Sequence, residues 1–178
     1  MVAFPSLKPR HVLIAFGFGA LSTLLASWGE IGLAFNAFPL LMPNSMDEST
    51  WAMILLAVVI APFVEELAKP LGLYFIHSEE KADLELKEWA FLGAMAGLGF
   101  AVVENLMYAF GVIDFGTETS IWLLGLRFLL PLHMIASAIS GYGIGLWVKT
   151  GKAKYFVACI AVSMLLHGAF NLAATLVG

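Results

Sequence analysis

The chain has 178 residues, of which 61% are hydrophobic and only 12% are charged, and its mean hydropathy is +0.91. Soluble domains carry about 45–50% apolar and roughly 25% charged residues, so this composition excludes a disordered chain and a conventional soluble protein. The net charge of −4 provides no basic surface for nucleic acid, and a single cysteine excludes a disulfide framework. We therefore predict an all-α membrane protein with several spans.

Five apolar stretches are long enough to cross a bilayer, which requires a helix of roughly 20 residues. They cover residues 11–42, 51–77, 89–112, 120–148 and 155–177. The connectors between them are short and polar, and the sequence shows no internal repeat. We expect one integral membrane domain, residues 1–178, folded as a transmembrane helical bundle whose motif-bearing spans cover about 51–177.

The first stretch is longer than one crossing requires and contains the charged residue Glu30. We favour a crossing from His11 to Gly29, followed by an interfacial or re-entrant piece that ends at Met42; the alternative is one long tilted helix. Glu30 is placed near the outer end of this crossing, where a structural role is expected. The stretch exceeds the about 7–15 apolar residues of a cleaved signal peptide, so we expect it to be retained.

The basic residues indicate the orientation in the membrane. Seven of the nine lie before the first span or in the second and fourth connectors: Lys8, Arg10, Lys81, Lys87, Lys149, Lys152 and Lys154. The first and third connectors contain none. Because cytoplasmic loops are enriched in Lys and Arg, we predict a cytoplasmic amino terminus and, after an odd number of crossings, an outer carboxyl terminus.

Ionisable residues lie at similar depths within four of the predicted spans. They are Glu65, Glu66, Lys69, Glu104, His133 and His167. Each charge at mid-bilayer costs at least ~2.5–3.5 kcal/mol, so such residues face the interior of a bundle or a wet cavity. We therefore predict that they converge on one shared site.

Helical spacing and prolines refine this prediction. Lys69 follows the two carboxylates by four and three residues, so it can lie beside both. Glu104 shares a helix face with Tyr108, and His167 shares one with Asn171. Prolines 62, 70 and 131 lie next to these clusters, and each removes a helical hydrogen bond, which predicts locally opened helices around a polar pocket.

Three ways of balancing the buried charges stay open. Three glutamates carry −3 if ionised, and Lys69 offsets one of these charges. Two protonated histidines, one divalent cation held by neutral imidazoles, or a protonated carboxylate would balance the remainder. Each solution leaves a titratable group positioned for proton transfer. The sequence lacks the Gly-x-Ser-x-Gly and His-Glu-x-x-His motifs of other hydrolases.

Four motifs follow one another on consecutive spans. They are Glu65-Glu66-x-x-Lys69, Phe100-x-x-x-Glu104-Asn105-x-x-Tyr108, His133, and His167-x-x-x-Asn171. This ordered set resembles the PrsW family of intramembrane proteases, which is related to the CAAX prenyl-endopeptidase and bacteriocin-immunity superfamily. The resemblance implies hydrolysis of peptide bonds in membrane-anchored proteins or peptides, within the cytoplasmic membrane of a prokaryote.

The resemblance also assigns roles to residues. Glu65 would be the general base, assisted by Glu66, while His133 and His167 would position the water, bind a metal or stabilise the oxyanion. Glu104 would be a ligand or a second acid–base group. Supporting roles would fall to Lys69, Asn105, Tyr108 and Asn171, the last as a polarising amide.

Two questions of chemistry and class stay open at this stage. The candidate ligands for a divalent metal such as zinc are Glu104, His133 and His167, but glutamate-activated water without a metal is an alternative. A proton- or cation-coupled transporter would use the same residues as a relay and would show proton flux without proteolysis. A non-catalytic binding or immunity scaffold would tolerate their replacement.

Overall fold

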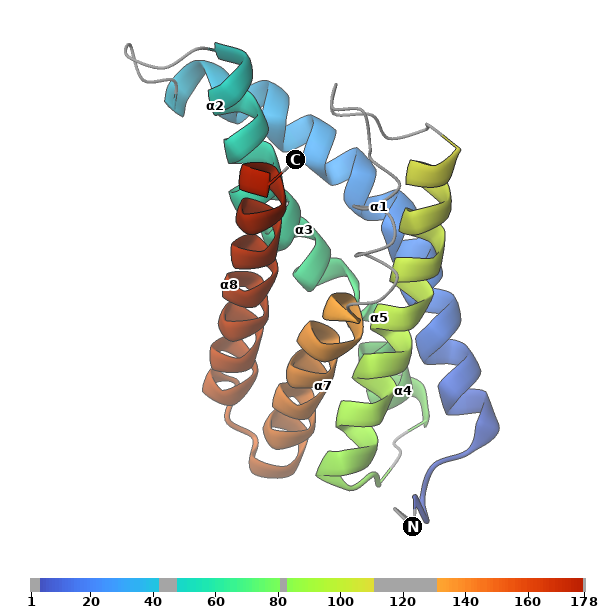
Figure 1. Ribbon diagram of the computed structural model, residues 1–178. Coiled ribbons are helices and arrows are strands. Elements are labelled where there is room, and N and C mark those ends of the chain that lie inside the picture. The colour runs from blue at the N-terminus through green and yellow to red at the C-terminus, as the bar shows by residue number, and fades with distance from the viewer. Residues whose placement is uncertain (1–3, 42–47, 81–82, 111–130, 178) are drawn as a thin grey trace.

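A computed structural model of the chain describes residues 4–41, 48–80, 83–110 and 131–177 (Figure 1). Throughout these ranges the regular structure is helical, so the all-α prediction is confirmed. The elements are α1 (Pro9–Leu41), α2 (Glu48–Ile54), the π-helix η1 (Leu55–Ile60), α3 (Ala61–Ala68), α4 (Leu71–Glu80), α5 (Leu86–Ala109), α7 (Leu132–Thr150) and α8 (Lys154–Val177).

Four of the described stretches are long and apolar enough to cross a membrane. They cover residues 9–36, 51–78, 86–109 and 154–175, and they correspond to the first, second, third and fifth predicted spans. The fourth predicted span contains α7, but residues 120–130 lie outside the described residues. The start of α1 and the end of α8 lie at opposite ends of the bundle (Figure 1). Which end faces the cytoplasm stays a prediction.

Helix α1 is continuous through Gly29, so the favoured division at that residue is wrong and one long helix is present, which runs obliquely to α8 (Figure 1). Its tilt in the membrane stays a prediction. The part after Gly29 has its own packing partner, which explains its continuity. Ala34 forms a small apolar cluster with Leu55 and Ile60 of η1. A Cβ added at Gly29 would lie 2.9 Å from a methyl carbon of Val64, so α1 also lies closely against α3.

The second span is divided by its prolines, as predicted. Pro62 lies in the first turn of α3, directly after the π-helix, and Pro70 separates α3 from α4. The wider hydrogen-bonding pattern of a π-helix is rare and is often found at functional sites. Pro131 similarly precedes the first residue of α7.

Helix α5 lies between α1 and α7, and glycines allow the close approach on its α7 side. A Cβ added at Gly97 would overlap the carbonyl oxygen of His133, and one at Gly93 would overlap that of Ser137. Glycine at these two positions therefore lets α5 and α7 lie in direct backbone contact. On the outer surface large apolar side chains such as Trp28 and Leu165 are exposed, as expected of a lipid-facing surface.

We expect Gly97→Val to destabilise the protein by about 1–3 kcal/mol, because the new side chain has no space between α5 and the start of α7. Thermal unfolding in detergent measures the effect. Gly17→Ala is the control, since no atom lies within 4 Å of a Cβ at Gly17. Equal stability of the two variants would contradict the packing described here.

Candidate active site

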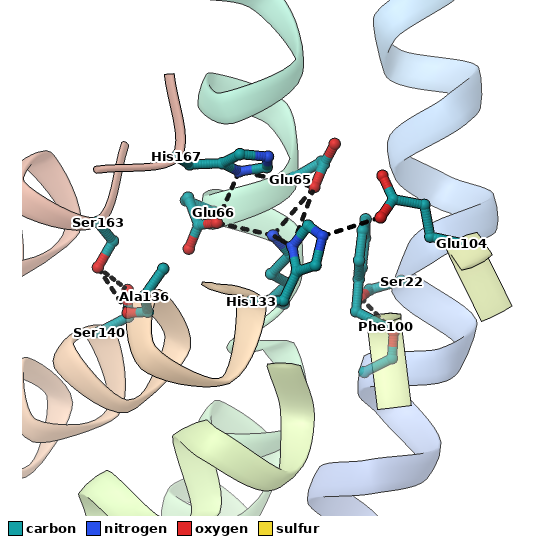
Figure 2. Close-up of polar contacts among 12 residues, drawn as sticks. Ser22, Glu65, Glu66, Phe100, Glu104, His133, Ala136, Ser140, Ser163 and His167 are labelled. Atoms are coloured by element: carbon teal, nitrogen blue, oxygen red, sulfur yellow. Dashed lines mark hydrogen bonds and ion pairs between the residues drawn. The ribbon is translucent and has the colours of Figure 1, made fainter. Parts of the chain in front are cut away.

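Side chains from α3, α5, α7 and α8 meet in one buried cluster (Figure 2). The six residues predicted to converge do so: Glu65, Glu66, Lys69, Glu104, His133 and His167. The first four and His167 are at most 5% exposed, and the His133 side chain is 11% exposed. A cluster this deeply buried is stable only if its charges are paired within it.

Lys69 lies at the centre of the cluster. Its Nζ is 2.7 Å from Glu66 Oε1, 3.0 Å from Glu65 Oε2 and 2.9 Å from His133 Nδ1. The Phe100 ring centroid lies 4.3 Å from the same nitrogen. Lys69 caps the last turn of α3 immediately before Pro70, so the end of this helix directs the ammonium towards all three partners. The predicted contact with both carboxylates is therefore present.

His133 connects Lys69 to Glu104. Because an ammonium can only donate, Nδ1 accepts from Lys69 and the ring proton lies on Nε2, which is 2.8 Å from Glu104 Oε2. His133 lies in the first turn of α7, so the close contact of α7 with Gly97 also positions this ring.

His167 pairs with the second glutamate. Its Nδ1 is 3.0 Å from Glu66 Oε1, which also accepts from Lys69. A carboxylate in such contacts accepts, so Nδ1 carries the proton and Nε2 is the nitrogen left to accept a hydrogen bond or bind a cation. The two imidazole rings are nearly perpendicular, with centroids 5.0 Å apart.

Glu65 has the environment expected of a reacting group. Its Oε2 faces Lys69 and lies 3.8 Å and 3.9 Å from Nδ1 of His167 and His133. Its other oxygen points away from these contacts (Figure 2). Glu66, by contrast, uses Oε1 for both Lys69 and His167 and is completely buried.

Asn171 has a different environment from the one predicted. Its Nδ2 donates to the carbonyl oxygen of Ala57 in η1 at 2.8 Å, rather than to the ionisable cluster. In the i→i+5 pattern that carbonyl would accept from residue 62, but Pro62 has no N–H. Asn171 thus supplies the missing donor and joins α8 to the helix that leads into Glu65.

The remaining predicted residues lie on α5. Asn105 is buried next to Glu104, and its Oδ1 accepts no hydrogen bond from the described residues. Tyr108 is half-buried one turn after Glu104. Glu30, for which a structural role is predicted, lies in α1 near enough to Glu65 and Glu104 for their charges to influence it, and its role stays a prediction.

The donors present have the chemistry of a metal site. Ligand atoms of Glu65, His133 and His167 lie within 4.8 Å of one another, and two histidines with one carboxylate are a common ligand set for zinc. This set contains Glu65 where the sequence suggested Glu104, which instead contacts the far side of the His133 ring through Nε2.

The model of the PrsW family of intramembrane metalloproteases matches residues 8–178. The chain belongs to this family. One curated relative, Protease PrsW of Clostridioides difficile strain 630, is 25% identical over 171 residues. The match covers 90% of this chain and 66% of the relative's length. No solved structure matches the chain significantly. As a PrsW family member with long apolar helices, the chain is an integral membrane protein.

We expect Asn171→Leu to lower the free energy of unfolding by about 1–3 kcal/mol, because it leaves the Ala57 carbonyl without its donor. Denaturation in detergent measures the change. Asn36→Leu is a matched control, since the exposed Asn36 side chain donates to the Gly32 carbonyl of its own helix, and its replacement should cost about 0.5 kcal/mol or less. An equal cost for both variants would show that the bond to η1 is not important.

Proposed function

We propose that this PrsW family member is an intramembrane endopeptidase that hydrolyses peptide bonds of membrane-anchored proteins or peptides. The family assignment supports a protease, and one feature of the cluster supports the mechanism. That feature is Glu65, whose Oε2 is held by Lys69 and faces both histidines while its other oxygen points away from them (Figure 2).

In the proposed reaction, Glu65 takes a proton from water as the water oxygen attacks the carbonyl carbon of the scissile bond. The carbonyl oxygen becomes an oxyanion, which dipoles in a dry, preorganised site stabilise better than bulk water does. The tetrahedral intermediate then collapses, its C–N bond breaks, and Glu65 returns the proton to the departing amine. The products are a carboxyl group and an amine, and Glu65 is regenerated.

The other residues prepare this step. Lys69 fixes Glu65 and compensates part of its charge, while Glu66 orients His167 so that Nε2 can accept a hydrogen bond from the water. Glu104 holds the His133 ring through Nε2. Glu65, His133 and His167 are residues of the type that hold a divalent metal, which would supply Lewis-acid polarisation, but both ring nitrogens of His133 already contact Lys69 and Glu104. The proposed step therefore relies on Glu65 alone as the base. Asn105 and Tyr108 support the α5 face.

The proposed setting follows from the same chemistry. The substrate must enter the bilayer to reach a cluster between membrane-spanning helices, so membrane-anchored proteins are the proposed partners. We place the protein in the cytoplasmic membrane of a prokaryote, with residues 1–178 as one membrane domain.

We expect Glu65→Gln to reduce the cleavage rate by about 10²–10⁴-fold, because the amide keeps the shape but cannot take a proton. Protein reconstituted in liposomes with a transmembrane peptide is assayed by mass spectrometry of the products. Glu85→Gln is the matched control, since Glu85 is exposed and pairs with Lys87 outside the cluster. Unchanged cleavage by Glu65→Gln would eliminate this mechanism, and proton flux without cleavage by the unaltered protein would support a transporter instead.

A further inference from the structure

The Lys69 ammonium has three polar partners in the cluster. It donates hydrogen bonds to Glu66 Oε1 and His133 Nδ1, at 2.7 and 2.9 Å, and forms an ion pair with Glu65 Oε2 at 3.0 Å. The Phe100 ring adds a cation–π contact. No part of Lys69 is exposed, so these protein groups balance its charge. Buried charges in proteins are normally paired or coordinate a metal.

Two of the three residues that contact Lys69 also belong to the candidate metal set. Lys69 Nζ contacts Glu65 Oε2 and His133 Nδ1, and the set consists of Glu65, His133 and His167. Zinc bonds to such donors at about 2.0–2.2 Å. An ion bound to Glu65 Oε2 and His133 Nδ1 would therefore lie almost in contact with the ammonium, and in a buried site little solvent would screen the repulsion.

We propose that Lys69 is the resident cation of this site and excludes a divalent metal from Glu65, His133 and His167. Net charge alone does not decide the matter, since three carboxylates against one ammonium would also accommodate a dication. The positions decide it, because Lys69 holds Glu65 Oε2 and His133 Nδ1. The second oxygen of Glu65 and Nε2 of His167 are then the donors left in the set, fewer than the three protein ligands of a catalytic zinc site. The Nε2 side of His133 is not an alternative route, since that nitrogen contacts Glu104.

Moving Lys69 aside would be costly. The side chain is enclosed between Glu66, His133 and the Phe100 ring, and its backbone ends α3 immediately before Pro70. A displaced ammonium would leave these acceptors for a hydrocarbon environment. Lys69 is thus a positioning residue that keeps Glu65 in place and does the charge compensation that a metal performs in other peptidases. The part of this inference that concerns catalysis, the positioning of Glu65, rests on the proposed function.

Zinc content tests the inference directly. The full-length protein in detergent is incubated with Zn²⁺, freed of unbound metal, and analysed for zinc per chain by mass spectrometry. The d–d absorption spectrum of added Co²⁺ reports independently which coordination geometry the bound metal has. We expect the unaltered chain to bind far less than one zinc, and Lys69→Met to bind zinc at least about tenfold more tightly, because the ammonium no longer repels it. Adding His167→Ala to Lys69→Met should remove that zinc.

Two controls separate charge from packing. Lys69→Arg keeps the positive charge, so its zinc content should equal that of the unaltered chain. Lys87→Met removes an exposed lysine that pairs with Glu85, and its zinc content should also be unchanged. If Lys69→Arg gains as much zinc as Lys69→Met, the effect is one of packing and the proposal is overturned.

The unaltered chain decides the matter even if Lys69→Met does not fold. One zinc per unaltered chain, lost on His167→Ala, would overturn the proposal. A folded Lys69→Met that gains no zinc would also overturn it, since the donors would then not be limited by the ammonium. Because zinc content is measured without substrate, a chain that cleaves no peptide can still confirm or refute this inference, and its failure is distinct from that of the proposed function.

Discussion

The pairing of Lys69 with Glu65 and Glu66 is the interaction on which the rest of the site depends. Ionised groups in the hydrocarbon region lack water, so each must obtain its stabilisation from a neighbour on the protein. Removing one member of such a group leaves an uncompensated buried charge, which costs more than the pair itself gains. The three residues lie at the end of α3, two in its last turns and Lys69 at its C-cap. A short local sequence thus brings together the charges that the other helices then enclose.

The positions of the partner helices depend on small residues as much as on polar ones. α7 can bring His133 next to Lys69 only because Gly97 allows its first turn to lie against α5. On the other side Gly168 lets α8 approach η1, since a Cβ there would lie 2.6 Å from the Val58 carbonyl oxygen. Glycines distant from the chemistry therefore fix distances within it.

The convergence of the cluster was predictable from sequence, because charged side chains at one depth in a membrane are stable only where they face one another or a wet cavity inside the bundle. The detail was not. Which carboxylate lies beside both histidines depends on how each helix is rotated about its axis, and this rotation is set by packing between helices. The sequence alone therefore could not show that this carboxylate is Glu65 and not Glu104. The depth of Glu30 in the membrane stays a prediction, because the tilt of α1 cannot be derived from hydropathy. The sequence predicts that Pro62 removes a helical hydrogen bond. The donor that replaces it, Asn171, lies 114 residues from Ala57 in the sequence, so helical spacing could not identify it.

The π-helix has a consequence for how this segment tolerates changes in length. Each residue of an α-helix advances the chain by about 100° around the axis, and a π-helical stretch accommodates its residues with more of them in each turn. The direction in which α3 presents its two carboxylates therefore depends on both the number of residues from Leu55 to Ile60 and their π-helical winding. Deletion of one residue there is absorbed by a change to α-helical winding, which leaves Glu65 and Glu66 facing the cluster, whereas a deletion between Ala61 and Val64 turns both carboxylates by about 100°.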